Sequence, residues 1–374
     1  MRTIVVAEQG TTVRADGKML VVEQAGQTLK KLRTADVDQL VLMGRVELSS
    51  GAIALLARTE IDAVFLTVKG SYRARLVTRT SKNVVLRCRQ WERAWDEPFV
   101  TELARAIVVG KLTHQRQTLL RAQRERKDDR IADALTRMRL LIDQAKQVGN
   151  VDSLRGFEGA GAALYFSQFG KLIRNPEFSF AGRNRRPPRD PVNAALSFSY
   201  ALLLNTIETE TLRCGLDPFR GYFHEPAHGR PSLVLDLMEE FRPLIDLFVL
   251  RLLNRRQLGP SDFDIKTGRS LEAVLADQED GESEPAENDG EDAATADEHD
   301  APFDGGSVPE RAVYLGETGR RIVLAAYFKR MRERILYPPR RQRLELRQIA
   351  REQCYHLARV IQGEEPQYIP FLPR

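Results

Sequence analysis

Short apolar runs alternate with polar stretches over the first 76 residues of the chain. The four clearest runs read TIVVA, KMLVVEQ, QLVLMG and DAVFLTV. Runs of this kind predict β-strands, and Asp16-Gly17 predicts a tight hairpin turn between the first two of them. One short helix is expected over residues 50–58. The pattern therefore predicts a small β-rich domain over residues 1–82.

The hydrophobic spacing becomes helical after about Asn83. Apolar residues recur every three or four positions over residues 99–123 and 130–148, and Gly149-Asn150 interrupts the pattern. A further helix is expected over residues 318–337. The chain is therefore predicted to have an α+β fold, in which a small β-rich domain is followed by a larger, all-α-helical domain over residues 83–374.

The composition is typical of a protein that works in water. Of the 374 residues, 42% are hydrophobic, and no apolar run is long enough to cross a bilayer. The first residues lack the apolar core and cleavage site of a signal peptide, so we expect a cytoplasmic location. Cys88, Cys214 and Cys354 are odd in number and far apart, which favours reduced thiols over disulfides or a zinc site.

Charge is distributed very unevenly along the chain. Residues 277–304 contain 13 acidic residues and no Lys or Arg, a composition that predicts a disordered insert. Without that insert, 57 Lys and Arg residues face 39 acidic residues, a formal charge of about +18. A body this basic is expected to bind a polyanion.

Residues 221–243 contain the highest density of potential metal-binding and acid–base groups. His224 and His228 lie among glycines and prolines, in a loop that leads into an expected helix. His114, by contrast, lies among Lys and Gln on a helix that we expect to be exposed. The loop histidines are therefore the better candidates for chemistry.

The helix expected after this loop carries Asp236, Glu239 and Glu240 on the side opposite its apolar residues. One interpretation is a solvated polar face. The other is a metal site that also uses His224 and an acid from elsewhere in the chain, such as Glu158. Carboxylates with one imidazole form a mostly oxygen site that suits Mg²⁺ or Mn²⁺.

Glu158 is the single acid in the stretch LRGFEGAGAALYF, at what we expect to be the start of a helix. An acid there stabilises the helix dipole and caps free amides. The neighbouring small residues also allow close approach by a nucleic acid strand, although helix packing would use them equally well. Spacing alone leaves these interpretations open.

Three successive blocks within residues 155–244 carry a resemblance. They read RGFEGAGAALYF, GRNRRPPRDPVNAALSFSYALL and CGLDPFRGYFHEPAHGRPSLVLDLMEEFRPL. In order and wording they resemble the CRISPR-associated endonucleases that act as spacer-acquisition integrases, the Cas-one family. The resemblance implies a β-rich N-terminal domain that dimerises and a helical, metal-dependent catalytic domain.

The resemblance also implies a set of functional residues. It places the metal ligands at Glu158, His224 and Glu239, which are also the expected catalytic residues, with Mg²⁺ or Mn²⁺ as cofactor. Asp236 matches a second acid near the metal and ranks as supporting. His228 is a departure from the family pattern, interpreted either as a competitor for the metal or as a loop histidine near DNA.

The implied activity is that of a CRISPR adaptation integrase and DNA endonuclease. The 3′-hydroxyl of a short DNA fragment attacks a phosphodiester of the CRISPR repeat, without a covalent enzyme intermediate. The implied partners are double-stranded and branched DNA, a second copy of the chain and the small Cas-two protein. Two alternatives remain at this point: a metal-dependent DNA-repair nuclease that acts on branched DNA, and a catalytically silent DNA-binding scaffold.

Basic stretches provide candidate DNA contacts, with a solvated surface as the alternative. The first stretch lies between the expected ligands, and the second, residues 337–351, lies near the C-terminus. Tyr165 and Phe166 are interpreted as core residues rather than DNA contacts. The C-terminal EEPQYIPFLPR is interpreted as an extended peptide on a partner surface. The candidates in the first stretch are Arg183, Arg185, Arg186 and Arg189.

Overall fold

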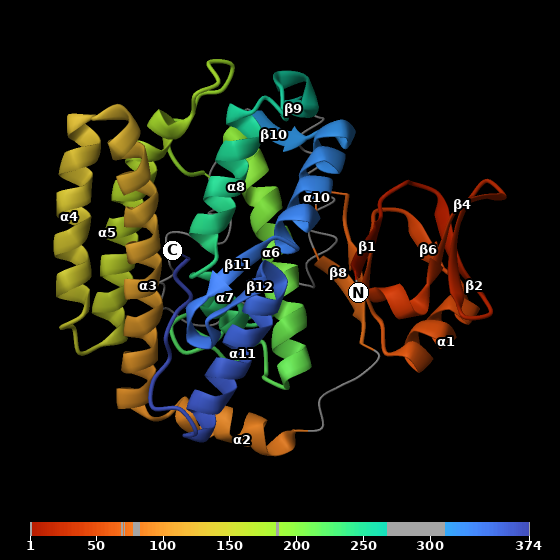
Figure 1. Cartoon of the computed structure of the whole chain (residues 1–374), viewed down its shortest axis with the longest axis horizontal. Helices are drawn as coiled ribbons and strands as arrows, with labels where there is room; N and C mark the ends of the chain where they lie inside the picture. Colours follow the sequence, from red (N-terminus) through yellow and green to blue (C-terminus); the bar gives the residue numbers. More distant parts are fainter. Residues whose placement is uncertain are drawn as a thin grey trace, which may run out of the picture. The chain divides into compact units, whose positions relative to one another are not determined.

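The computed structural model describes residues 2–68, 70, 72–77, 83–184, 187–267 and 311–373. The acidic insert expected over residues 277–304 lies outside the described residues. The chain divides into two units, residues 1–82 and residues 83–374. Both units are drawn in Figure 1.

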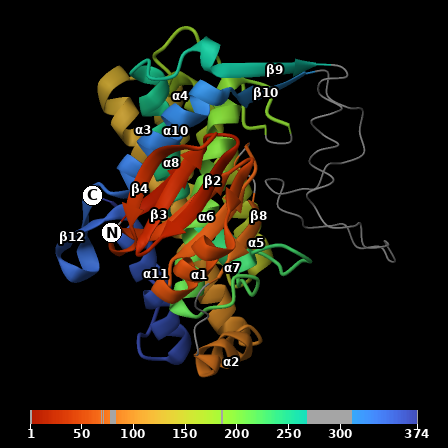
Figure 2. The same ribbon diagram turned by 90° about the vertical axis from the view of Figure 1, so that its right-hand side faces the viewer.

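The N-terminal unit contains two four-stranded sheets and one helix. One sheet has the order β1-β5-β7-β8, and its first three strands are parallel. The other has the order β4-β3-β2-β6, and Figure 2 shows its strands β4, β3 and β2 side by side. Apolar side chains such as Val13, Leu20, Leu40 and Leu56 form the core. The elements are β1 (Arg2–Val6), β2 (Thr11–Asp16), β3 (Met19–Gln24), β4 (Gln27–Arg33), β5 (Val37–Met43), β6 (Val46–Leu48), α1 (Ser50–Thr59), β7 (Asp62–Leu66) and β8 (Tyr72–Leu76).

The predicted hairpin turn exists, but it joins a different pair of strands. Asp16 pairs with Met19, so Gly17 and Lys18 form the turn between β2 and β3. Gly17 has a φ of 59°, which favours glycine there. The run TIVVA forms β1 in the other sheet instead. The sequence analysis missed β2 because TTVRAD is too polar to be recognised as an apolar run.

The larger unit is predominantly helical. Polar residues cap five successive helices: Asn83, Asp96, Asp128, Asn150 and Asp190 each accept a backbone amide from the first turn. In Figure 1, α3, α4 and α5 lie side by side. The helices are α2 (Val84–Arg93), α3 (Glu97–Arg126), α4 (Asp129–Ala145), α5 (Val151–Phe169), α6 (Pro191–Cys214), α7 (Ser232–Met238), α8 (Arg242–Asn254), α10 (Glu317–Met331) and α11 (Leu346–Gln362).

The predicted α+β fold, a β-rich unit followed by a mainly helical one, is confirmed, but the second unit is not entirely helical. Two antiparallel strand pairs interrupt it, and the helix expected over residues 318–337 ends at Met331, where the chain turns into a strand. The pairs are β9 (Phe263–Thr267) with β10 (Arg311–Leu315), and β11 (Arg334–Tyr337) with β12 (Gln342–Glu345). Short 3₁₀ turns lie at residues 34–36, 170–172, 260–262 and 338–340.

The helix expected to carry all three acids is broken after Met238. Residues 239–241 form a turn, and α8 begins at Arg242. Pro243 accounts for the break, because it has no amide hydrogen to bond the carbonyl oxygen of Glu239 four residues earlier. Asp236 therefore lies within α7, whereas Glu239 and Glu240 lie in the turn that follows it.

No helix in the described part of the chain is both long and apolar enough to cross a membrane.

Candidate metal centre

Glu158 lies in the middle of α5 and not at its start. The helix begins at Val151, where Oδ1 of Asn150 accepts the amide of Ser153 at 2.8 Å and provides the cap. Glu158 is about two turns further along and only 1% exposed. Its interpretation as a capping residue is therefore wrong. A carboxylate buried this deeply requires a charged partner.

A lysine provides that partner and links two of the predicted ligands. Nζ of Lys111, on α3, forms an ion pair with Oε1 of Glu158 and lies 2.5 Å from Oε2 of Glu239. Nε2 of His224 lies 3.9 Å from Oε1 of Glu239, and Nε of Arg242 lies 2.8 Å from the same oxygen. The fold therefore brings all three predicted ligands together, from α5, the loop before α7 and the turn after α7.

Asp236 contacts the histidine and not the other acids. Its Oδ1 lies 2.7 Å from Nδ1 of His224, and its two oxygens also accept the amides of Tyr222, Phe223 and His224. Because an ionised carboxylate can only accept, Nδ1 carries a hydrogen, and Nε2 on the other side of the ring faces Glu239. Asp236 thus orients the ring and shapes the loop around it.

The positive groups keep the buried Glu239 ionised. Burial alone would raise the pKa of this carboxyl group, but Arg242 and Lys111 outweigh burial and hold the pKa below its ordinary value. For Lys111 the balance is reversed. Burial would lower the pKa of its ammonium, whereas Glu158 and Glu239 raise it. Glu239 and Lys111 are therefore both charged although they are buried in the protein interior.

The donors present fit a hard divalent cation. Within the described residues, no three His, Cys, Asp or Glu side chains are already grouped as metal ligands, because the ammonium of Lys111 lies between the two carboxylates. Two carboxylates and an imidazole whose far nitrogen bonds a carboxylate are nevertheless the groups that hold Mg²⁺ or Mn²⁺ in proteins. A cation would compete with this ammonium for the same oxygens.

Neither Lys111 nor Arg242 was predicted from the sequence to belong to this centre. Lys111 is 5% exposed and lies in the stretch VVGKLTH, as a lone cation among apolar residues. A single lysine among apolar residues on a helix indicates a buried ammonium group with an acidic partner, because a lysine is almost never fully buried unless it is paired. This was the signal that the sequence offered. His114, in the same stretch, was expected to be exposed and is in fact 1% exposed.

The acids after the loop are buried, which rules out the interpretation as a solvated helix face. Asp236, Glu239 and Glu240 are each 3% exposed or less. Glu240 does not point to the centre, and its carboxylate is bonded by Gln353 and by residues of the C-terminal segment. His228 is exposed, in contrast to the buried His224.

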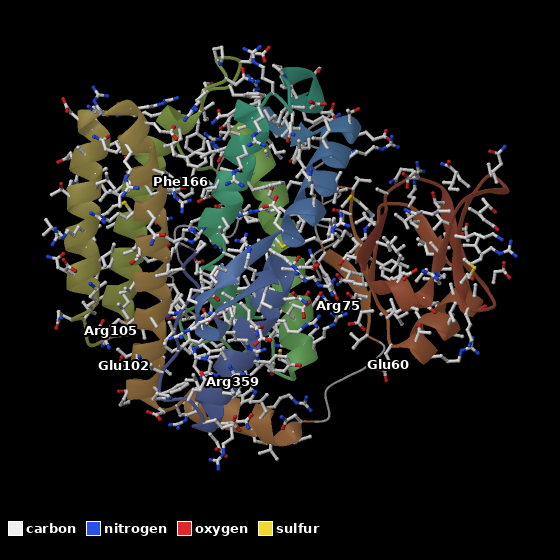
Figure 3. All side chains as sticks on the ribbon, in the orientation of Figure 1. Glu60, Arg75, Glu102, Arg105, Phe166 and Arg359 are labelled. Carbon is white, nitrogen blue, oxygen red and sulfur yellow. The ribbon has the colours of Figure 1, made fainter. Side chains whose placement is uncertain are left out.

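The small residues around Glu158 serve helix packing at one position. A Cβ at Gly161 would lie 2.2 Å from Cδ2 of Leu112, so α5 and α3 approach closely there. A Cβ at Gly159 would meet nothing within 4 Å. Tyr165 and Phe166 are buried, as expected of core residues, and Figure 3 labels Phe166.

The structure describes two of the four predicted DNA-binding arginines. The guanidinium of Arg183 bonds Oδ1 of Asn193 at 2.7 Å and Oγ of Ser197 at 3.1 Å, so it braces the start of α6. Arg189 is exposed. Arg185 and Arg186 lie outside the described residues. Contact of these arginines with DNA remains a prediction.

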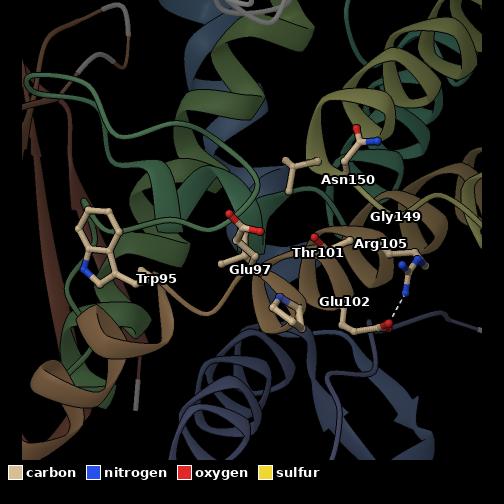
Figure 4. Close-up of a pocket in the computed structure, with 11 residues that line it drawn as sticks. Trp95, Glu97, Thr101, Glu102, Arg105, Gly149 and Asn150 are labelled. Carbon is tan, nitrogen blue, oxygen red and sulfur yellow. Dashed lines mark hydrogen bonds and ion pairs between the residues drawn. The ribbon is translucent and has the colours of Figure 1, made fainter.

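A pocket of about 680 Å³ lies apart from the predicted ligands. It lies between the N-terminal end of α3 and the turn before α5, as Figure 4 shows. Trp95, Glu97, Glu102, Arg105 and Asn150 are among its lining residues, and neither Glu158 nor His224 lines it. The pocket therefore does not belong to the candidate metal centre.

Comparisons with known proteins identify the family. Residues 4–280 match the family model described as CRISPR associated protein Cas1. The chain is 39% identical to the CRISPR-associated endonuclease Cas1 2 of Rhodospirillum rubrum, over 74% of this chain and 83% of that protein. It is 32% identical to the CRISPR-associated endonuclease Cas1 1 of Moorella thermoacetica, over 100% of this chain and 99% of that protein.

A solved structure shares the fold. A chain of a Cas6-RT-Cas1–Cas2 complex aligns with a TM-score of 0.75 at 20% identity, and the alignment covers 99% of this chain and 36% of that longer chain. The matches to the family model and to these relatives show that the chain belongs to the Cas1 family of CRISPR-associated proteins.

Proposed function

We propose that this protein is a CRISPR adaptation integrase and a metal-dependent DNA endonuclease. In this reaction the 3′-hydroxyl oxygen of a short DNA fragment forms a bond to a phosphorus of the CRISPR repeat, and the bond from that phosphorus to its own strand breaks. The number of phosphodiester bonds is conserved, so no high-energy cofactor is required. Water in place of the hydroxyl gives hydrolysis.

The observation that carries the proposal is the buried convergence of Glu158, His224 and Glu239 in a chain of this family. In our proposal these residues hold Mg²⁺ or Mn²⁺. When bound, such an ion polarises a phosphodiester and stabilises the charge that develops on its oxygens. Asp236 holds a hydrogen on Nδ1 of His224 and turns Nε2 inward, which leaves Nε2 of a neutral ring as the atom that would bind the metal.

The remaining charges at the centre position the ligands. Arg242 holds Oε1 of Glu239 at 2.8 Å, which limits rotation of that carboxylate. In the same proposal Lys111 and Arg242 balance the charges of Glu158 and Glu239 before DNA and metal arrive. The three acids and their side-chain partners Lys111, His224 and Arg242 come from α3, α5 and residues 224–242.

The proposed partners follow from the charge of the protein and from the family. The basic body, with Arg183, Arg185, Arg186 and Arg189 as candidate contacts, is expected to bind double-stranded and branched DNA. A homodimer and a complex with the small Cas2 protein are proposed, the latter because the matched structure is a complex that contains Cas2. An integrase of chromosomal arrays would act in the cytoplasm.

The comparisons favour this function over the alternatives considered from the sequence. The relatives are named CRISPR-associated endonucleases, which favours neither a general DNA-repair nuclease nor a silent scaffold. All three predicted ligand positions hold residue types that bind a divalent cation.

A strand-transfer assay tests the proposal. A short duplex with free 3′-hydroxyls is incubated with a supercoiled plasmid that carries a CRISPR repeat, in the presence of Mn²⁺ and Cas2. We expect Glu158→Ala to lower joining by more than the 10- to 100-fold typical of groups that only orient a ligand. Asp152→Ala is the matched control, because Asp152 is an exposed acid in the first turn of the same helix.

The result separates the interpretations of Glu158. Joining that requires the metal and is lost in Glu158→Ala supports the site, provided that Asp152→Ala behaves as wild type. Undiminished joining by Glu158→Ala would remove this residue from the ligand set.

A further inference from the structure

The C-terminal segment, residues 363–373, packs against its own unit, although the sequence suggested a partner surface. Gly363, with a φ of 79°, ends α11 and reverses the direction of the chain. In Figure 1 the C-terminus lies beside α3. The segment contributes the buried residues Tyr368 and Phe371, which are 6% and 2% exposed.

The first half of the segment is fastened to α11. Nε of Arg359, labelled in Figure 3, lies 2.5 Å from Oε1 of Glu365, and Nδ1 of His356 pairs with the other oxygen of that carboxylate. Nε2 of His356 accepts the amide of Ile369 at 2.9 Å, and its ring stacks on Tyr368 with centroids 5.1 Å apart. These contacts determine where the following residues lie.

The second half of the segment binds the carboxylate of Glu240. The amide of Phe371 donates to Oε2, and the hydroxyl of Tyr368 donates to Oε1 at 2.9 Å. Nε2 of Gln353, on α11, donates to Oε2 at 2.9 Å. Glu240 is 3% exposed, so these donors replace the water that it would otherwise bind.

Glu240 is the chain neighbour of Glu239, in the turn between α7 and α8. Its carbonyl oxygen lies 3.2 Å from Nδ1 of His114, one turn along α3 from Lys111. Pro370 lies against Gly110 of the same helix, where a Cβ would be only 2.7 Å away. The segment therefore contacts both the turn that carries Glu239 and the helix α3 that carries Lys111.

We propose that residues 364–371 form a positioning strap for the candidate metal centre, and that Glu240 is the residue through which it acts. By binding Glu240, the strap fixes the turn after α7 and hence the position of the Glu239 carboxylate. Phe371 reinforces the strap because its ring packs near Phe241, with centroids 6.0 Å apart. This inference rests on the proposed function, in which Glu239 is a metal ligand.

Substitutions in the full-length chain test the strap. Phe371→Ala removes the buried anchor, Tyr368→Phe removes one hydrogen bond to Glu240 and keeps the stacked ring, and Ile369→Ala is the control because that side chain is 53% exposed. We would measure the Kd for Mn²⁺ by electron paramagnetic resonance, the melting temperature, and strand transfer as a function of Mn²⁺ concentration.

We expect Phe371→Ala to weaken Mn²⁺ binding by about tenfold, the lower end of the range for groups that orient metal ligands. High Mn²⁺ should then restore its strand transfer. Tyr368→Phe should show a smaller change in the same direction, and Ile369→Ala should match wild type. A weaker Kd for Mn²⁺ at a temperature at which the variant is fully folded is the result that a purely structural role would not give.

The inference is overturned if the folded Phe371→Ala protein has a lower melting temperature but binds Mn²⁺ as wild type does. If Phe371→Ala does not fold, Tyr368→Phe decides in the same way. Failure of the proposed function would be visible separately, because wild type itself would then bind no Mn²⁺ at this centre.

Discussion

Lys111→Met tests whether the ammonium group between the two carboxylates occupies the position at which a metal ion binds. The change removes one positive charge and keeps a side chain of similar length at a site that is 5% exposed. In wild type, Lys111 and Arg242 balance the formal charges of Glu158 and Glu239. The variant has one uncompensated negative charge.

The expected magnitudes follow from burial. Removing one partner of a buried ion pair typically costs about 3–5 kcal/mol. Without metal, we expect Lys111→Met to lower the free energy of unfolding by about 3 kcal/mol. The loss is at the lower end of this range because Arg242 still pairs with Glu239 at 2.8 Å. With metal the difference between the variant and wild type becomes smaller, since the divalent ion no longer competes with the ammonium. At 100 times its Kd, an ion that binds only the folded state adds about 2.7 kcal/mol.

The assay is urea unfolding in EDTA and in Mn²⁺, together with the Kd for Mn²⁺. We expect Lys111→Met to be less stable than wild type in EDTA, to bind Mn²⁺ about tenfold more tightly, equivalent to about 1.4 kcal/mol, and to regain most of its stability with the ion. Lys171→Met is the control, because Lys171 pairs with Asp128 at 2.8 Å at a partly exposed site. The reasoning is refuted if Mn²⁺ stabilises Lys111→Met no more than wild type.

Three further changes give expected outcomes. Asp236→Asn should weaken Mn²⁺ binding 10- to 100-fold in calorimetry, because one of the two oxygens that accept from His224 and the loop amides becomes a donor that faces other donors; equal affinity would contradict that role. Burial lowers the pKa of His114 to about 4 in the folded protein. As the pH falls from 6.5 to 4, the unfolded chain binds a proton at this residue before the folded protein does, so the free energy of unfolding decreases. His114→Gln should remove about 3 kcal/mol of this decrease, measured by urea unfolding at several pH values. Gly161→Ala should lower the melting temperature, at a cost of about 1–3 kcal/mol, whereas Gly159→Ala, which faces open space, should raise it; equal shifts would exclude the packing argument.

Helix starts and the change from strands to helices could be predicted from the sequence, because both depend on residues close together in the chain. Caps such as Asn83, Asp96 and Asn150 mark where helices begin, because the cap interaction involves only residues two or three positions apart. The change from strand to helix spacing could be read for the same reason. The short polar strand β2 and the strands within the helical unit could not, since strand pairing depends on partners distant in sequence.

The candidate ligands Glu158, His224 and Glu239 were available from the sequence as motifs, but their environment was not. Lys111 lies 47 positions before Glu158, and the strap that binds Glu240 lies more than 120 positions after it. Burial of a charge depends on every element that surrounds it, and none of those distances is encoded in local spacing. The burial of these acids, their pairing with Lys111 and the contact of Asp236 with His224 could therefore be seen only in the folded structure.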